Sequence, residues 1–219
     1  MLSTSLLSLS LLPLAFAHFN LDYPASRGFD DDKEGDFPCG GFNDVSSNRV
    51  DFPISGGPVQ VRFGHPSTNV AVYMAIGDNP GSSFNIVAQQ QIQVQGLGQF
   101  CFGNVAVPAG LNVTDGTKAT IQVVTNNHES GGLYQCADVT LVNTPISSTD
   151  FNNNCKNGST SITQQNISGN PNGTSTTAAS GSSSASAAAA SPTQTGAASQ
   201  MKAVSWALGA VGLAGMAML

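Results

Sequence analysis

The sequence has few charged residues, and basic residues are the scarcest of them. Lysine and arginine together number 7 against 13 aspartates and glutamates, which gives a formal net charge of −6. This acidic balance argues against a nucleic-acid partner and suits cations or a solvated extracellular surface. The chain also lacks a phosphate-binding glycine loop, a G-x-S-x-G motif and an H-E-x-x-H motif, so no common enzyme signature is present.

Residues 1–17 are predicted to be a secretory signal peptide. A leucine-rich stretch that is too short to span a bilayer precedes Ala15-Phe16-Ala17, which resembles a cleavage site. Cleavage there makes His18 the first residue of the mature protein. A free α-amine and an imidazole would then stand on one residue, and two nitrogen donors suit copper or zinc. The alternative is that cleavage leaves a histidine there by chance.

The C-terminal end carries a second targeting signal. Residues 203–219 are apolar and uncharged, and they follow the polar spacer Pro192–Lys202 and the small residues Ala185–Ser191. This order predicts a GPI-attachment signal over residues 191–219 that is removed on maturation. A tail-anchored transmembrane helix is the alternative. The expected location is the extracellular face of the plasma membrane or the cell wall, with the GPI lipid as the only membrane contact.

The chain between the two signals divides by composition. Residues 18–155 contain every acidic residue, histidine and cysteine, and their number supports a single hydrophobic core. Residues 156–190 are rich in Ser, Thr, Ala and Asn and cannot bury enough apolar surface to fold, so we expect a disordered, glycosylated stalk. The predicted N-glycosylation sites are Asn112, Asn157, Asn166 and Asn172.

The four cysteines form an even set in a domain that is expected to be secreted. Two disulfides are predicted, and three pairings are open. A structural zinc site is the alternative, although the chain has no C-x-x-C motif. The residues are Cys39, Cys101, Cys136 and Cys155.

The folded domain is predicted to be all-β. Apolar and polar residues alternate in several short runs, and Gly, Pro, Asn and Asp separate these runs. No segment of useful length has a helical period. The pattern predicts an immunoglobulin-like antiparallel β-sandwich, with closure into a barrel as the alternative. The predicted strands cover residues 59–63, 70–76, 91–95, 99–107, 119–124 and 133–142.

Three other residues are candidates for a metal site with His18. His65 follows a predicted strand at a corner where a sandwich can present ligands, although a surface histidine is the simpler reading. His128 lies in a polar loop and is expected to be solvated. Asp138 shares a strand face with Cys136, so a buried disulfide at Cys136 would make Asp138 at least half-buried. A buried carboxylate needs a cation, and Arg62 and copper are both open as its partner.

These residues resemble a known fungal family. The similarity lies in His18-Phe-Asn-Leu-Asp-Tyr-Pro-Ala-Ser-Arg-Gly, Pro38–Gly41, Phe63-Gly-His65 and Leu133–Asp138. The chain resembles the GPI-anchored copper acquisition factors, which are copper proteins similar to lytic polysaccharide monooxygenases. The resemblance implies one copper ion (Cu²⁺) per domain, bound by His18, His65 and Asp138.

The same resemblance implies a role in extracellular copper acquisition or homeostasis, without polysaccharide cleavage. The expected partners are the copper ion and either a membrane copper importer or cell-wall glycans. The acidic run Asp30-Asp31-Asp32-Lys33-Glu34 is expected to be a solvated loop that could also collect cations.

Two alternative functions remain. A copper-dependent polysaccharide monooxygenase would share the two histidines. However, an aspartate ligand favours Cu(II), and the only tryptophan, Trp206, lies in the segment that GPI processing would remove. A non-catalytic structural or adhesion module of the cell wall would explain the sandwich, stalk and anchor. It would leave the position of His18 to chance.

Overall fold

The computed structural model describes residues 18–126 and 131–172, all of which belong to the first of two compact units, residues 1–177. The predicted signal peptide, His128 and everything from residue 173 onward, including the predicted GPI-attachment signal, lie outside the described residues. Within the described part of the chain, no helix is long and apolar enough to cross a membrane.

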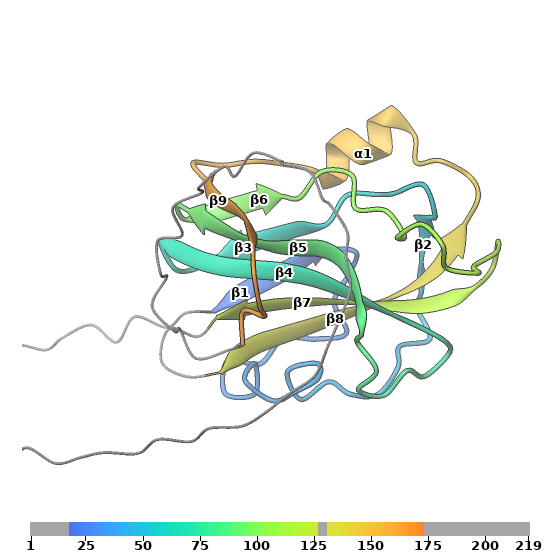
Figure 1. Cartoon of the computed structure of the whole chain (residues 1–219), viewed down its shortest axis with the longest axis horizontal. Helices are drawn as coiled ribbons and strands as arrows, with labels where there is room; N and C mark the ends of the chain where they lie inside the picture. The colour runs from blue at the N-terminus through green and yellow to red at the C-terminus, as the bar shows by residue number, and fades with distance from the viewer. Residues whose placement is uncertain (1–17, 127–130, 173–219) are drawn as a thin grey trace, which may run out of the picture. The chain divides into compact units, whose positions relative to one another are not determined.

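Two β-sheets form a sandwich, which confirms the predicted fold class (Figure 1). The smaller sheet has the strand order β1-β3-β6, and the larger has the order β2-β8-β7-β4-β5-β9. Neighbouring strands are antiparallel except for β2 and β8, which pair in parallel. The elements are β1 Phe19–Tyr23, β2 Val50–Pro53, β3 Gln60–Phe63, β4 Ser67–Ile76, β5 Ile86–Gln95, β6 Gly98–Cys101, β7 Lys118–Asn126, β8 Gly132–Val142, α1 Ser148–Asn154 and β9 Ser161–Ile167.

The strands in which apolar and polar residues clearly alternate lie at their predicted positions, whereas other parts of the chain differ from the prediction. β3, β4, β5, β7 and β8 lie where the sequence placed them, whereas the run 99–107 forms only the short β6 and an isolated bridge at Val105. β9 lies in the segment predicted to be a disordered stalk, so the ordered chain continues past residue 155. Its side chains are almost all exposed, and it is held by pairing with the edge of β5. Amino-acid composition does not predict a strand such as β9, because β9 buries little apolar surface and is held by backbone pairing with an edge strand.

The inner strands β7 and β8 are buried on both faces. Their inward face carries core residues such as Ile121, Val123 and Val139. The opposite face is covered by residues 24–49, which we call the covering loop. The covering loop is fixed there by the Cys39–Cys136 disulfide, which bonds it to β8. Polar residues on this face are therefore as buried as the core.

Both predicted disulfides are present, and the structure gives their pairing. Cys39 bonds Cys136 and connects the covering loop to β8. Cys101 bonds Cys155 and connects β6 to the chain just after α1.

The four predicted glycosylation sites differ in their surroundings. Asn112 and Asn166 are exposed. The side-chain oxygen of Asn157 accepts a hydrogen bond from the backbone N–H of Cys101. The side-chain nitrogen of Asn172, the atom that a glycan would modify, donates to the hydroxyl of Tyr134 at 3.0 Å. Glycosylation itself stays a prediction at all four sites.

Candidate functional site

The pairing of β1 with β3 brings His18 and His65 to the same end of the smaller sheet. Phe19 stands opposite Phe63, so His18 precedes one strand where His65 follows the other. The backbone N–H of Gly64 donates to the carbonyl oxygen of His18 at 2.9 Å. A Cβ atom at position 64 would lie 2.9 Å from that same oxygen. Because the backbone at Gly64 approaches the backbone at His18 so closely, only glycine fits at position 64.

The hydrogen bond of the His18 ring indicates which nitrogen carries the proton. His18 Nε2 lies 3.0 Å from the backbone carbonyl oxygen of Asp31. Because a carbonyl can only accept, this contact needs a hydrogen on Nε2 and leaves the lone pair on Nδ1. Nδ1 is the ring nitrogen that can chelate a metal together with the α-amine of the same residue. That amine exists only after the peptide bond between Ala17 and His18 is cut.

His65 has a similar constraint on its ring. His65 Nδ1 lies 3.1 Å from the backbone carbonyl oxygen of Ser67, and the Ser67 N–H lies 3.4 Å from the same nitrogen. The two contacts require opposite tautomers, and the shorter one favours a ring proton on Nδ1 with the lone pair on Nε2. A hydrogen bond from one ring nitrogen to a backbone carbonyl is the usual way that a metal-binding histidine is oriented.

The acidic run beside His18 is not uniformly solvated, which corrects the expectation for Glu34. Asp31 and Asp32 are exposed, but Glu34 is only 1% exposed. Glu34 Oε1 accepts hydrogen bonds from the Phe19 N–H at 3.3 Å and from Gln135 Nε2 at 2.9 Å. Glu34 Oε2 lies 4.0 Å from His18 Nε2 and has no hydrogen-bond partner among the described residues.

Nothing in the local sequence separates Glu34 from its exposed neighbours. Its burial depends on the covering loop, because the Glu34 carbonyl oxygen accepts from the Tyr134 N–H of β8 at 2.8 Å. Burial raises the pKa of Glu34 to about 7, although hydrogen bonds from Gln135 and the Phe19 backbone lower it. A cation bound near His18 would favour the charged carboxylate.

Asp138 lies under the covering loop, where it forms a buried ion pair. Its two oxygens each accept a hydrogen bond from Arg27, from Nε and from Nη2, both at 2.8 Å. The hydroxyl of Thr120 and the backbone N–H of Ser46 add two more donors, each at 2.7 Å. The side chains of Arg27 and Asp138 are 4% and 0% exposed. Burial alone raises the pKa of Asp138, but these hydrogen bonds and the Arg27 charge outweigh it and hold the pKa below its ordinary value.

The structure therefore gives Asp138 the salt-bridge role that the sequence left open, with Arg27 in place of Arg62. Arg62 instead pairs with Asp22 on the surface, at 2.6 Å. Across residues 18–126 and 131–172, no three His, Cys, Asp or Glu side chains are gathered closely enough to hold a metal ion. His18 and His65 are brought to one end of the sheet, and Asp138 is not assembled with them into such a cluster.

Comparison with known proteins gives a consistent family. Residues 16–160 match the family model described as copper acquisition factor BIM1-like. An uncharacterized protein of Aspergillus fumigatus is 46% identical over 136 residues, which are 60% of this chain and 56% of that protein. Copper acquisition factor BIM1 of Cryptococcus neoformans var. grubii is 37% identical over 138 residues, 58% of this chain and 62% of that protein.

A more distant relative has a different name. The lytic polysaccharide monooxygenase-like protein ham-7 of Neurospora crassa is 34% identical over 164 residues, 65% of this chain and 71% of that protein. The match to the first two relatives spans less than two thirds of their length.

The buried ion pair predicts a large loss of stability when one partner is removed. Asp138→Asn leaves Arg27 buried without a counter-charge and should lower the free energy of unfolding by about 3–5 kcal/mol. The exposed Arg62–Asp22 pair provides the control, since Asp22→Asn should cost about 0–1 kcal/mol. Urea denaturation measures both. Equal midpoints for the two variants would contradict the role assigned to Asp138.

The same ion pair predicts that the free energy of unfolding decreases in acid. Because the folded-state pKa of Asp138 is depressed, its contribution is complete above the unfolded-state value of about 3.9 and is lost as the pH falls through the folded-state value. Asp138→Asn should flatten this part of the stability profile.

Proposed function

Because the chain belongs to the copper acquisition factor BIM1-like family, we propose that it binds one copper ion at the His18 end of β1 and serves extracellular copper acquisition or homeostasis. The observation that carries the proposal is the pairing of β1 with β3, which brings two histidines to one end of the sheet. The backbone contacts of the two rings favour the tautomers that suit joint coordination.

The proposed donors are three nitrogens. The α-amine and Nδ1 of His18 supply two, and Nε2 of His65 supplies the third. Imidazole and amine donors suit Cu²⁺. The amine requires cleavage after Ala17, so the proposal includes removal of the signal peptide.

The acidic run supplies negative charge next to these nitrogens. Asp31 Oδ1 and Glu34 Oε2 each lie 4.0 Å from His18 Nε2. Asp31 is exposed and can turn toward an ion, whereas Glu34 is fixed by its contacts with Phe19 and Gln135. Asp138 stays outside this proposed set, because four donors already occupy its carboxylate.

The proposal places the protein on the outer face of the plasma membrane or in the cell wall, attached through a GPI lipid. The composition of residues 191–219 supports the anchor, and that of residues 173–190 supports a glycosylated stalk. An importer in the membrane would be the recipient of the copper.

Copper binding through the α-amine can be tested directly. A protein with one additional residue before His18 lacks the amine chelate and should bind Cu²⁺ more weakly by orders of magnitude than the protein that begins at His18. His65→Ala should also weaken binding and alter the electron paramagnetic resonance spectrum. Isothermal titration with a competing chelator measures the affinities. Equal affinity in the extended and authentic proteins would refute the amine ligand.

The role of the acidic run can be tested with three matched variants. Asp31→Asn and Glu34→Gln each remove a carboxylate near His18 and should lower the copper affinity by about 10- to 100-fold, as is typical of groups that support metal ligands. Asp32→Asn removes the same charge from an exposed neighbour and serves as the control. If all three variants lose affinity equally, only the general negative potential matters.

We also propose that the protein does not cleave polysaccharides. Of the three tyrosines, Tyr134 is buried and the other two are half-buried, so they offer no fully exposed platform for a glycan chain. The copper-loaded protein, given a reductant and cellulose or chitin, should release no oxidised oligosaccharides in mass spectrometry. Release that disappears in His65→Ala would establish the monooxygenase alternative instead.

A further inference from the structure

β1 is an edge strand of the smaller sheet, and its outer edge is bonded to one side chain of the larger sheet. β3 pairs with β1 on one side. On the other side, the Leu21 N–H donates to Gln135 Oε1 at 2.9 Å, and Gln135 Nε2 donates to the carbonyl oxygen of Phe19. At the edge of a sheet such backbone groups would otherwise wait for a further strand. The amide of Gln135, a residue of β8, takes the place of a peptide group from that strand.

The same amide also fixes Glu34. Gln135 Nε2 donates to Glu34 Oε1 at 2.9 Å, and Glu34 Oε1 also accepts from the Phe19 N–H at 3.3 Å. A side-chain amide has two N–H donors, so the Phe19 carbonyl and the Glu34 carboxylate use both of them. Gln135 and Glu34 are 2% and 1% exposed. One buried side chain therefore joins β8, β1 and the covering loop next to His18.

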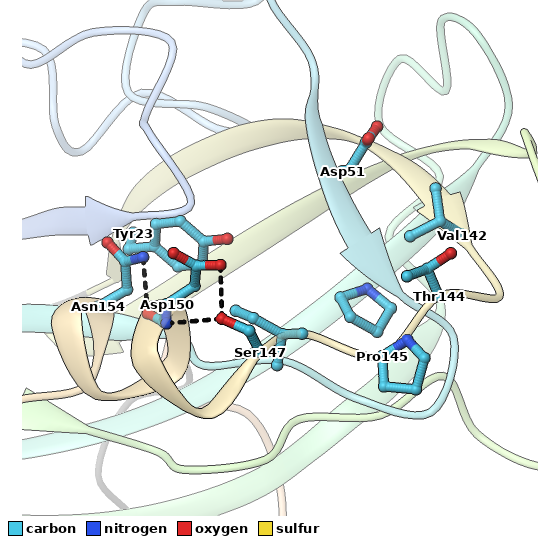
Figure 2. Close-up of a pocket in the computed structure, with 10 residues that line it drawn as sticks. Tyr23, Asp51, Val142, Thr144, Pro145, Ser147, Asp150 and Asn154 are labelled. Atoms are coloured by element: carbon cyan, nitrogen blue, oxygen red, sulfur yellow. Dashed lines mark hydrogen bonds between the residues drawn. The ribbon is translucent and has the colours of Figure 1, made fainter.

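The opposite end of β1 has different surroundings. Tyr23 borders a pocket of about 530 Å³, which Asp150 and Asn154 of α1 also line (Figure 2). The bonds between β1 and Gln135 lie instead at Phe19 and Leu21, toward the His18 end of the strand. Gln135 thus holds the part of β1 that leads directly into the proposed copper site.

We propose that Gln135 is a positioning residue for this site, which orients His18 before copper binds. The inference rests on the proposed function, because it concerns the same site. Phe19 is joined to His18 by a peptide bond, so a shift of the Phe19 backbone moves the amine and the ring of His18 together. Gln135 acts through Phe19 and Glu34 and does not touch the metal. Ligands that are held in place bind more tightly, because less conformational freedom is lost on binding.

The test compares Gln135→Met with Gln122→Met in the protein that begins at His18. Gln135→Met keeps a side chain of similar length but removes the amide. It should lower the Cu²⁺ affinity by about 10- to 100-fold and change the electron paramagnetic resonance spectrum. Gln122 is the matched control, because it is also 2% exposed but its amide bonds Pro38 of the covering loop instead of β1. Gln122→Met should lose stability in urea and keep the copper affinity and spectrum of the unmodified protein.

A second measurement needs neither copper nor a folded variant. In the copper-free, unmodified protein, the Leu21 amide should be protected from hydrogen exchange by its bond to Gln135. Rapid exchange at Leu21 would overturn the proposal. In Gln135→Met this amide should exchange about tenfold faster, and in Gln122→Met at an unchanged rate.

Two further outcomes would contradict the positioning role. One is an unchanged copper spectrum and affinity in Gln135→Met, and the other is an equal change in Gln122→Met. A failure of the unmodified protein to bind copper would refute the proposed function itself, and it would be seen before any variant is compared.

Discussion

The ion pair between Arg27 and Asp138 is the interaction on which the rest of the structure depends. It fixes the start of the covering loop to β8 under complete burial. The same loop then supplies Asp31 and Glu34 to the neighbourhood of His18. Loss of the pair would destabilise the domain and loosen the start of this loop, whereas the Cys39–Cys136 disulfide and the contacts of Glu34 would still hold its later part.

The covering loop also explains the unusual composition of the larger sheet. Ordinarily, an antiparallel sheet exposes one face, and that face carries polar residues. Here Thr120 and Gln122 face outward on β7 but are 0% and 2% exposed, because the loop lies over them. Gln122 donates to the carbonyl of Pro38 in the loop at 2.7 Å. Polar residues on this face are thus retained as attachment points for a segment that has little regular structure of its own.

The sequence predicted the features that depend on local pattern. The alternation of apolar and polar residues located β3, β4, β5, β7 and β8. The same alternation placed Asp138 on the face of β8 that carries Cys136, and both residues are buried. The missed features depend on contacts between distant segments. Arg27 is 111 residues from Asp138, and local sequence does not distinguish it from Arg62 as a partner. Glu34 resembles its solvated neighbours, since only the path of the covering loop buries it.

The contact between Asn172 and Tyr134 connects β9's end of the chain to the surroundings of His18. Asn172 contacts the Tyr134 hydroxyl, and the Tyr134 N–H bonds the carbonyl of Glu34, the neighbour of His18. Asn172 therefore lies toward the same end of the sandwich as His18, and Tyr23 lies at the other end of β1. His18 and Tyr23 therefore mark opposite ends of the domain, and a group that approaches one of them does not meet the other.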